Sequence, residues 1–402
     1  MEICENLKTP VKYTPDVLVA GGGIGGIAAA LAAARQGASV LLVERGFMLG
    51  GLATAGLVTI YLPLCDGFGR QVSFGLAEEL LRLSVERFTV ADRPADNWLK
   101  SSDPAKRTEK DPRFEVDFNP QIFALDAERA LLDAGVDILY GTVAVDAYAA
   151  DGKITSVILE NKTGRIAVCP KSVVDATGDA DIAYRVGAPT ETFKQGNVVA
   201  YWCYTGGQDG YRRRMLGFAD IPDEKKAKGQ KSAASTELGR FSGLDGEEIT
   251  RFMIRSHEAT VAAYERFREA DPTCEIATLA SIPQLRMTRR IVGAYTQGSD
   301  EMHREYADSI GMVSDWRERG PVYEVPFSTL YSPEVKNLIM AGRCTSVTDG
   351  LWDVMRVIPC CAVTGEAAGV AATMTDDFSA IDIKELQNHL TQNGVVLHEK
   401  DL

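Results

Sequence analysis

The sequence has no pair of cysteines in CxxC spacing, although it contains eight cysteines in 402 residues. Zinc knuckles and iron–sulfur clusters depend on closely spaced thiolates, so the sequence predicts neither of these metal sites. Cysteines scattered through a large chain are typical of reduced thiols, and we therefore expect a cytoplasmic protein. Histidine is scarce as well, because His257, His303, His389 and His398 are the only four.

The chain also lacks an excess of basic residues. Its net charge is −13, with a sequence pI near 5.0. Binding to a phosphate backbone depends on clustered Lys and Arg, so nucleic acid is not an expected partner. No repeat, heptad run or low-complexity tract is present, and 45% hydrophobic with 25% charged residues is typical of a globular chain of about two domains.

Charge is absent from the eighteen residues between Val17 and Ala34. The run approaches the length of a membrane span, but Gly and Ala dominate it, and their transfer into lipid is far less favourable than that of Leu or Ile. A signal peptide begins with a basic region, whereas Glu2 and Glu5 precede the first lysine. We therefore expect neither a membrane span nor a signal peptide.

The same run reads as strand, turn and helix, and a second strand follows it. "DVLVA" is a buried strand, "GGGIGG" a turn, "GIAAALAAARQ" a helix and "ASVLLVE" a strand that ends at Glu44. Gly21, Gly23 and Gly26 then stand in the order GxGxxG, with an acid about twenty residues on, as a dinucleotide site requires. The sequence predicts that pyrophosphate binds at this helix N-terminus and that Glu44 accepts ribose hydroxyls.

NAD, NADP and FAD all use such a fingerprint, and Arg45 could even partner a 2′-phosphate. Later segments favour FAD, since "VVDATGDAD", "NLIMAGRCTS" and "RVIPCCAVTGEAAG" disperse the cofactor contacts along the chain. A nicotinamide domain normally completes its contacts in one contiguous region.

With these segments, and with "LGGLATAG", "YGTVAVDA", "RMTRRIVGAYT" and "YEVPFSTLYSPEVKNLIMAGRCTS", the sequence resembles the bacterial FAD-dependent oxidoreductases of glutathione-reductase-type fold. The resemblance covers nearly the whole chain. It implies noncovalently bound FAD and an α/β fold: a Rossmann-like FAD-binding domain, with helices on the faces of a parallel sheet, plus an inserted α+β substrate domain.

The resemblance also implies roles for individual residues. The pyrophosphate would lie on the fingerprint, the adenosine beside Glu44 and Arg45, and the isoalloxazine above a second glycine-rich segment. One departure is that Arg343 follows Gly342 where many such proteins have an aspartate for the ribitol, so Arg343 is expected to address phosphate. The implied cofactor-binding residues are Gly21, Gly23, Ile24, Gly25, Gly26, Glu44, Arg45, Gly51, Leu52, Ala53, Val143, Thr177, Gly178, Asp179, Gly342, Arg343, Val357 and Ile358.

A helix is expected to begin near Pro359, because proline is tolerated in a first helical turn. Its N-terminus, with the N–H groups of Val357 and Ile358, would stabilise the negative charge of reduced flavin. Next to it, Cys360 and Cys361 are expected to pack as small apolar residues.

The positions of these segments predict the domain organisation. Residues 1–65, 120–190 and 335–380 would form the FAD-binding domain, 66–119 and 191–334 the substrate domain, and 381–402 a C-terminal tail. Polar stretches at 91–113 and 221–240 are expected to be exposed loops, and the second is either a lid or a simple surface insertion.

Few side chains qualify for chemistry at the substrate. Arg286, Arg289 and Arg290 precede an apolar strand, and one of them is expected to clamp a carboxylate or another oxyanion while the others form ion pairs. We take Arg290, Arg286, His303 and Tyr323 as catalytic candidates, with Arg356 as a further one.

The predicted function is hydride transfer between flavin N5 and a small polar organic substrate, which could be an alcohol, an amine or an activated alkene. A nicotinamide dehydrogenase, a monooxygenase and a non-catalytic redox sensor or electron carrier remain alternatives. The sequence has no second dinucleotide fingerprint, and it leaves the electron acceptor or donor and the oligomeric state open.

Overall fold

A five-stranded parallel sheet forms the centre of the molecule in a computed structural model that describes residues 3–85, 87, 116–208, 210–217 and 238–402. Its strands lie in the order β20, β10, β2, β3, β6, and all neighbours are parallel. The predicted strand, helix and strand at the start of the chain are β2, α1 and β3. The bounds are β2 Val17–Ala20, α1 Ile24–Arg35, β3 Val40–Val43, β6 Asp137–Leu139, β10 Ser172–Asp175 and β20 Leu338–Met340.

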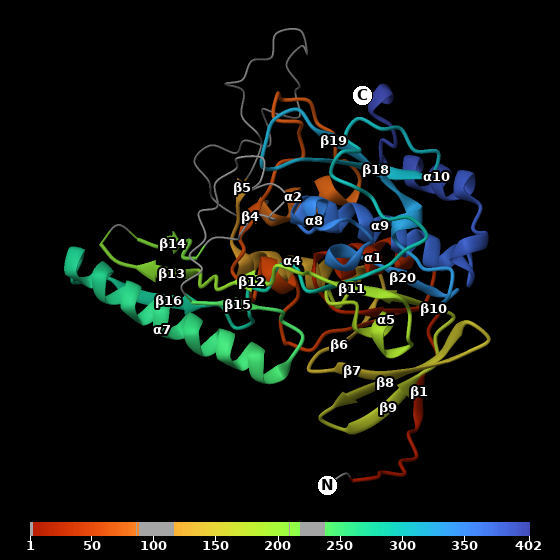
Figure 1. Ribbon diagram of the computed structural model, residues 1–402, viewed down its shortest axis with the longest axis horizontal. Coiled ribbons are helices and arrows are strands. Elements are labelled where there is room, and N and C mark those ends of the chain that lie inside the picture. Colours follow the sequence, from red (N-terminus) through yellow and green to blue (C-terminus); the bar gives the residue numbers. More distant parts are fainter. Residues whose placement is uncertain (1–2, 86, 88–115, 209, 218–237) are drawn as a thin grey trace.

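Alternate side chains of this sheet enter two different hydrophobic cores, because successive residues of a strand point to opposite faces. Val17 and Val19 lie in the core shared with α1 and with α9 (Ile358–Met374), whereas Leu18 and Ala20 lie in the core shared with a second sheet. That sheet has the order β1, β9, β8, β7. The molecule therefore has a layer of helices, a parallel sheet and a second, mainly antiparallel sheet (Figure 1), and the predicted α/β fold with a parallel sheet is confirmed.

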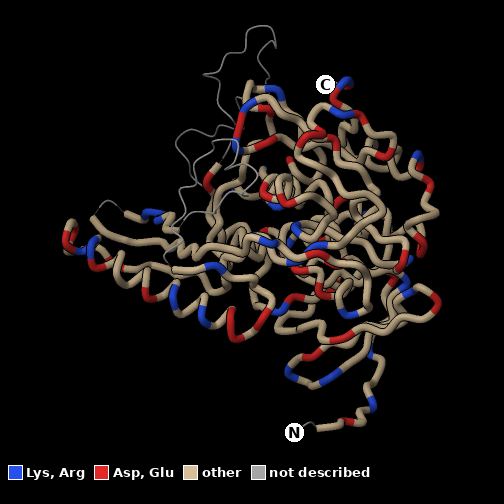
Figure 2. Tube along the Cα trace, viewed as in Figure 1, with Lys and Arg blue, Asp and Glu red and all other residues tan. Residues whose placement is uncertain are grey.

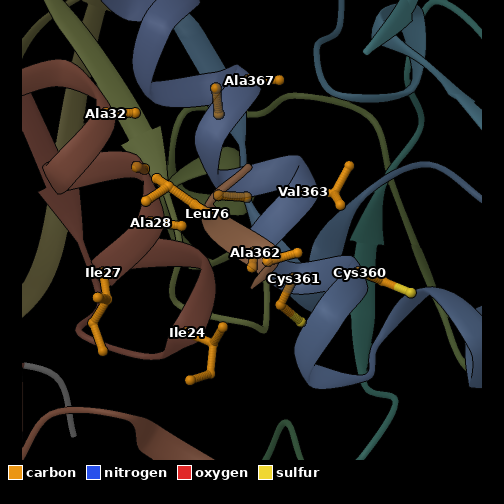
Figure 3. Close-up of a cluster of buried hydrophobic side chains, with 14 of the residues drawn as sticks. Ile24, Ile27, Ala28, Ala32, Leu76, Cys360, Cys361, Ala362, Val363 and Ala367 are labelled. Atoms are coloured by element: carbon orange, nitrogen blue, oxygen red, sulfur yellow. The ribbon is translucent and has the colours of Figure 1, made fainter. Parts of the chain in front are cut away.

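Helices α1 and α9 pack with their backbones in close approach. A Cβ atom added to Gly365 would lie 2.3 Å from the carbonyl oxygen of Gly25, and one added to Gly369 would lie 2.2 Å from that of Ala29. Figure 3 shows small side chains, among them Ala28, Ala362 and Ala367, in the cluster where the two helices meet. Glycine and alanine are therefore needed here for contact between the helices, in addition to any preference for helical structure.

The remaining elements surround these layers. Helix α2 packs against α9 and α4, α10 packs against α9, and α5 lies against the parallel sheet and β7. The other helices and the strands of the second sheet are α2 Leu76–Val85, α4 Pro120–Asp133, α5 Asp181–Arg185, α8 Asp349–Met355, α10 Ile383–Gln392, β1 Val11–Tyr13, β7 Val143–Ala150, β8 Lys153–Asn161 and β9 Gly164–Val168.

A long helix and several short antiparallel strands lie outside the two main sheets. Helix α7, Gly246–Ala270, extends to one side of the molecule beside β13, β14 and β16, and Figure 2 shows charges of both signs along it. The strands are β4 Ile60–Tyr61, β5 Val116–Asp117, β11 Thr190–Thr192, β12 Asn197–Val198, β13 Cys203–Gly206, β14 Arg212–Arg214, β15 Arg240–Phe241, β16 Glu275–Leu279, β17 Arg289–Ile291, β18 Ser309–Ser314 and β19 Val322–Pro326.

The expected loop at 91–113 lies outside the described residues. So does the second expected loop, 221–240, except for its last three residues. Within the described ranges, no single helix is both long and apolar enough to cross a bilayer. The division into an FAD-binding and a substrate domain stays a prediction, and we note that α2, from the first predicted insert, packs directly on α9.

The contact between α1 and α9 predicts that Gly369→Ala lowers stability. The added methyl group would overlap the Ala29 carbonyl and force the helices apart, which costs about 1–3 kcal/mol. We expect a fall in melting temperature of about 1–4 °C in thermal unfolding. Gly246→Ala is the matched control, because no atom lies within 4 Å of its added Cβ, and an equal loss in both variants would contradict the packing argument.

Glu366 on α9 predicts a pH-dependent term in stability. It is buried and accepts a hydrogen bond from the backbone N–H of Leu76 at 2.7 Å, and burial raises its pKa from 4.5 to about 7. Its contribution to stability is therefore fully present below pH 4.5 and is lost as the pH rises to about 7. Glu366→Gln keeps an acceptor oxygen and has no charge to bury.

We expect Glu366→Gln to leave the melting temperature nearly unchanged near pH 4.5 and to raise stability by about 1–3 kcal/mol near pH 8. Thermal unfolding across this pH range measures the difference between the two proteins. A variant that is less stable than the parent at pH 8 would show that the carboxylate is stabilised where it lies.

Candidate active site

A cavity of about 960 Å³ lies at the carboxyl ends of the central strands. Ala20, Val43, Ala176 and Ala341, which end or directly follow β2, β3, β10 and β20, all line it. In open parallel sheets ligands bind at this edge. Segments from the beginning, middle and end of the sequence therefore meet at one site.

The glycines of the fingerprint have different structural roles. Gly21 has φ +105°, which side chains disfavour, and a Cβ on Gly26 would lie 1.8 Å from the Gly21 carbonyl oxygen. In contrast, no protein atom lies within 4 Å of a Cβ built on Gly23. Gly21 and Gly26 thus shape the turn and pack it against α1, while Gly23 borders open space in the cavity.

Helix α1 begins at this space. Gly23 is its N-cap and makes no side-chain cap, so the N–H groups of the first turn are free of a capping side chain. Ile24 and Gly25 in that turn line the cavity. A helix N-terminus with free N–H groups attracts phosphate, and the arrangement fits a dinucleotide pyrophosphate.

Glu44 lies at the end of β3 and joins two glycine-rich loops. Its carboxylate accepts hydrogen bonds from the N–H of Gly22 and of Gly46, both at 2.7 Å. A carboxylate has about four acceptor positions, so two remain for ribose hydroxyls. Arg45 and Val143 line the cavity beside it, and their expected contacts with adenine stay predictions.

The loop after β10 is fixed by a buried acid. Asp175 accepts hydrogen bonds from the Thr177 N–H and hydroxyl and from the N–H groups of Ile182 and Ala183. Desolvation raises the pKa of Asp175 to about 6. These bonds hold Thr177, Gly178 and Asp179 at the cavity wall.

Arg343 is held by protein groups. Its guanidinium donates to the carbonyl of Leu285 at 2.7 Å and lies 3.2 Å from Asp179 Oδ1. Arg343 and Gly342 both line the cavity, and the Gly342 N–H donates a hydrogen bond to the Thr364 hydroxyl. Arg343 therefore joins three segments of the site, and its expected contact with phosphate stays a prediction.

Next to the fingerprint, to which Gly50 is joined by a hydrogen bond from its N–H to the Gly22 carbonyl, Gly51, Leu52 and Ala53 form a 3₁₀ turn in the cavity wall. Helix α9 begins nearby with Val357 as its N-cap, no capping side chain and Pro359 in its first turn. Val357, Ile358 and Cys361 line the cavity. Burial raises the pKa of Cys361 to about 12, so its thiol is protonated at neutral pH.

The whole arrangement fits FAD, since two uncapped helix N-termini and two glycine-rich segments border one cavity of about 960 Å³. The sequence profile of the family described as FAD dependent oxidoreductase matches residues 16–200 and 200–390. The chain belongs to the FAD-dependent oxidoreductase family. It is an enzyme with FAD as its cofactor, so the nicotinamide-only alternative is set aside.

Solved structures of several flavin enzymes are similar over most of their length. They include a geranylgeranyl bacteriochlorophyll reductase-like protein from Thermoplasma acidophilum, with 14% identity over 95% of this chain and 82% of that one and a TM-score of 0.44. An L-amino acid deaminase from Proteus myxofaciens shares 15% identity over 95% of both chains, with a TM-score of 0.45. The p-nitrophenol 4-monooxygenase from Pseudomonas putida shares 11% over 94% and 84%, with a TM-score of 0.45. No curated protein matches the sequence.

Of Arg286, Arg289 and Arg290, Arg286 is the one that lines the cavity. It is 6% exposed, and its Nε and Nη2 atoms have no hydrogen-bond partner in the part of the chain that the structure describes. The guanidinium lies 5.2 Å from the ring centroid of Trp202. Burial, together with the charges of Arg356 and Arg343, lowers the pKa of Arg286 to about 9, so it remains charged at neutral pH.

Arg356, at the end of α8, also lines the cavity but has a partner. Its Nη2 donates to the buried carboxylate of Asp353, which in turn lies 3.9 Å from Arg317 Nη1. Arg317 pairs with Asp315 at 2.8 Å. In the described part of the chain, each of these buried arginines thus has a carboxylate, whereas no carboxylate forms an ion pair with Arg286.

The other three catalytic candidates lie outside the cavity lining. Arg290 pairs with Glu191 at 2.6 Å, on the strand that β17 joins. The His303 ring pairs with Glu399 at 2.8 Å near the C-terminus, and the buried Tyr323 donates its hydroxyl proton to the Ser299 carbonyl. Arg289 donates to the Asp179 carbonyl and pairs with Asp181, so it supports the loop after β10.

Several cavity residues have no pattern in the sequence that marks them. Trp202 precedes β13, Trp316 lies between β18 and β19, and Ile282 follows β16. They come from separate segments with no shared spacing. The only local clue is that tryptophan is rare, with four in the chain.

The open space at Gly23 predicts that Gly23→Ala weakens FAD binding without destabilising the apoprotein. The methyl group meets no protein atom but occupies the space where the backbone approaches the pyrophosphate. We expect the dissociation constant for FAD to rise at least about tenfold, with an unchanged melting temperature of the apoprotein. Fluorescence titration with FAD measures the dissociation constant, and an unchanged value would place the pyrophosphate elsewhere.

Proposed function

We propose that the enzyme transfers a hydride between FAD and a small organic substrate that carries a carboxylate, and that Arg286 binds this carboxylate. The observation that carries the proposal is the buried guanidinium of Arg286: the residue lines the cavity, and two of its nitrogen atoms have no hydrogen-bond partner among the described residues. Its fork of N–H donors matches the two oxygens of a carboxylate.

The energetics support an anionic ligand. Removal of an ion from water costs several kcal/mol when no counter-ion compensates for it. The Trp202 ring contributes at most about 2 kcal/mol through a cation–π interaction. The remaining cost favours binding of an anion beside Arg286.

The position of Arg286 is fixed by contacts with the FAD-binding segments. The side chain of Gln284 accepts a hydrogen bond from the backbone N–H of Trp202 and donates one to the Gly56 carbonyl. The backbone N–H groups of Arg286 and Met287 donate to the Asn197 side chain at 2.8 and 3.0 Å. The carboxylate site is therefore rigidly connected to the loop that carries Gly51–Ala53, which would hold the isoalloxazine.

When bound, FAD supplies the hydride acceptor or donor at its N5 atom. The chain must then orient the reacting carbon and exclude water. When two fixed donors hold the carboxylate, the substrate loses its rotational freedom on binding. This loss supplies a large part of the entropy cost that the reaction would otherwise meet at the transition state.

The proposal predicts that acids react and their amides do not. FAD-loaded protein, oxidised or reduced, is mixed anaerobically with 2-hydroxy, 2-amino and unsaturated monocarboxylates and with the matching amides, and the flavin band near about 450 nm is followed. We expect at least one acid to change the flavin redox state, and its amide to react at least about tenfold more slowly.

Arg286→Gln should remove this preference for the acid, and Arg286→Lys should restore part of it because it keeps the charge but not the fork. Arg290→Gln is the matched control, since its partner Glu191 lies outside the cavity lining. A larger effect in Arg290→Gln would contradict the assignment. If Arg286→Gln shifted the flavin midpoint potential but kept the preference, Arg286 would serve the cofactor and not the substrate.

A further inference from the structure

The part of the cavity away from the dinucleotide loops is almost entirely apolar. Three short regions build it: the segment around β4, the strands β13 to β16 with the start of α7, and the turn between β18 and β19. Its largest described side chains are Trp202, Met215, Ile249, Ile282, Trp316 and Leu62. Polar groups among the described residues there are few and comprise mainly the arginines and Ser281.

From this lining we infer that the substrate is a monocarboxylate with an apolar, preferably aromatic body, held with its acid group at Arg286 and its body between apolar side chains that include Trp202 and Trp316. The inference rests on the proposed function and names the substrate class for that site. Where the sequence predicts a small polar organic substrate, the inference keeps the polar group as a carboxylate and adds an apolar body.

Polar bodies are disfavoured by the same lining. A hydroxyl moved from water into an apolar site without a hydrogen bond loses its hydration and gains nothing in return. A sugar acid would bring several hydroxyls, and a dicarboxylate would bring a second charge. The described apolar side chains offer neither of them a partner, whereas a ring gains from removal of its surface from water.

Trp202 connects the apolar part to the anion site. It is 7% exposed, and among the described residues its indole Nε1 has no hydrogen-bond partner. Since the Arg286 guanidinium lies over its ring, Trp202 places an aromatic surface beside the proposed carboxylate site. Trp316 is fixed on the cavity wall by its indole N–H, which donates to the Asp353 carbonyl at 2.9 Å.

The test is a binding titration of the FAD-loaded protein, followed by the perturbation of flavin absorbance. Phenylacetate is compared with acetate, which lacks the body, with gluconate, whose body is polar, and with phenylacetamide, which lacks the charge. We expect the dissociation constant of phenylacetate to be at least about tenfold below the other three.

The outcomes separate the inference from the proposed function. If gluconate or acetate bound as tightly as phenylacetate, the inference of an apolar substrate would be overturned. The proposal that Arg286 binds a carboxylate would be unaffected. If phenylacetamide bound as tightly as phenylacetate, the proposal that Arg286 binds a carboxylate would be overturned. The assignment of an apolar pocket would be unaffected. The absence of any saturable change with phenylacetate would overturn the inference as well.

A pair of variants tests the lining itself. Ile282→Asn places an amide in the apolar wall and should raise the dissociation constant of phenylacetate at least about fivefold, with FAD still bound. Leu279→Asn is the matched control, because Leu279 is on β16 close by in sequence, is 41% exposed and does not line the cavity. Equal effects of the two variants would refute the proposed pocket.

Discussion

The direct backbone contact between α1 and α9 is the constraint on which the site depends. Gly365 and Gly369 let α9 lie against the carbonyls of Gly25 and Ala29, so two helices from opposite ends of the sequence begin at the same cavity. Each helix has an uncapped N-terminus there. One N-terminus suits a pyrophosphate, and the other suits the negative charge that reduced flavin acquires. A larger residue at either glycine would separate the two halves of the cofactor site.

A second constraint is the balance of buried charge. Arg317 and Arg356 have Asp315 and Asp353, and Arg343 has Asp179. Within the described residues Arg286 has no such counter-ion, although it is more buried than the other three. Proteins rarely keep a buried charge without compensation, so the imbalance indicates a ligand. The apolar lining next to Arg286 then limits what that ligand is, because a polar body would be left without partners.

Much of this fold is predictable because its evidence is local. The β2–α1–β3 unit is marked by the glycine spacing and by Glu44, and the cofactor segments at β10 and β20 each combine an apolar strand with a glycine. Of the implied cofactor residues, all but Gly26 line the cavity, and Gly26 is packed against Gly21. The choice among the arginines was not predictable: Arg286 precedes β17 and enters the cavity, while Arg290, within β17, meets Glu191 on the neighbouring strand. His303 and Tyr323 depend equally on tertiary contacts, with Glu399 and Ser299, that no local pattern encodes.

The central claim is that an apolar monocarboxylate binds between Arg286 and the tryptophan-lined wall of the FAD-loaded enzyme. A crystal structure of that complex with 4-bromophenylacetate, with anomalous scattering from the bromine, tests it most directly. The account predicts carboxylate oxygens within about 3 Å of the Arg286 guanidinium nitrogens and a bromine peak among Trp202, Ile282 and Trp316. A bromine peak elsewhere, or a carboxylate held by other residues with Arg286 still unpaired, would contradict it.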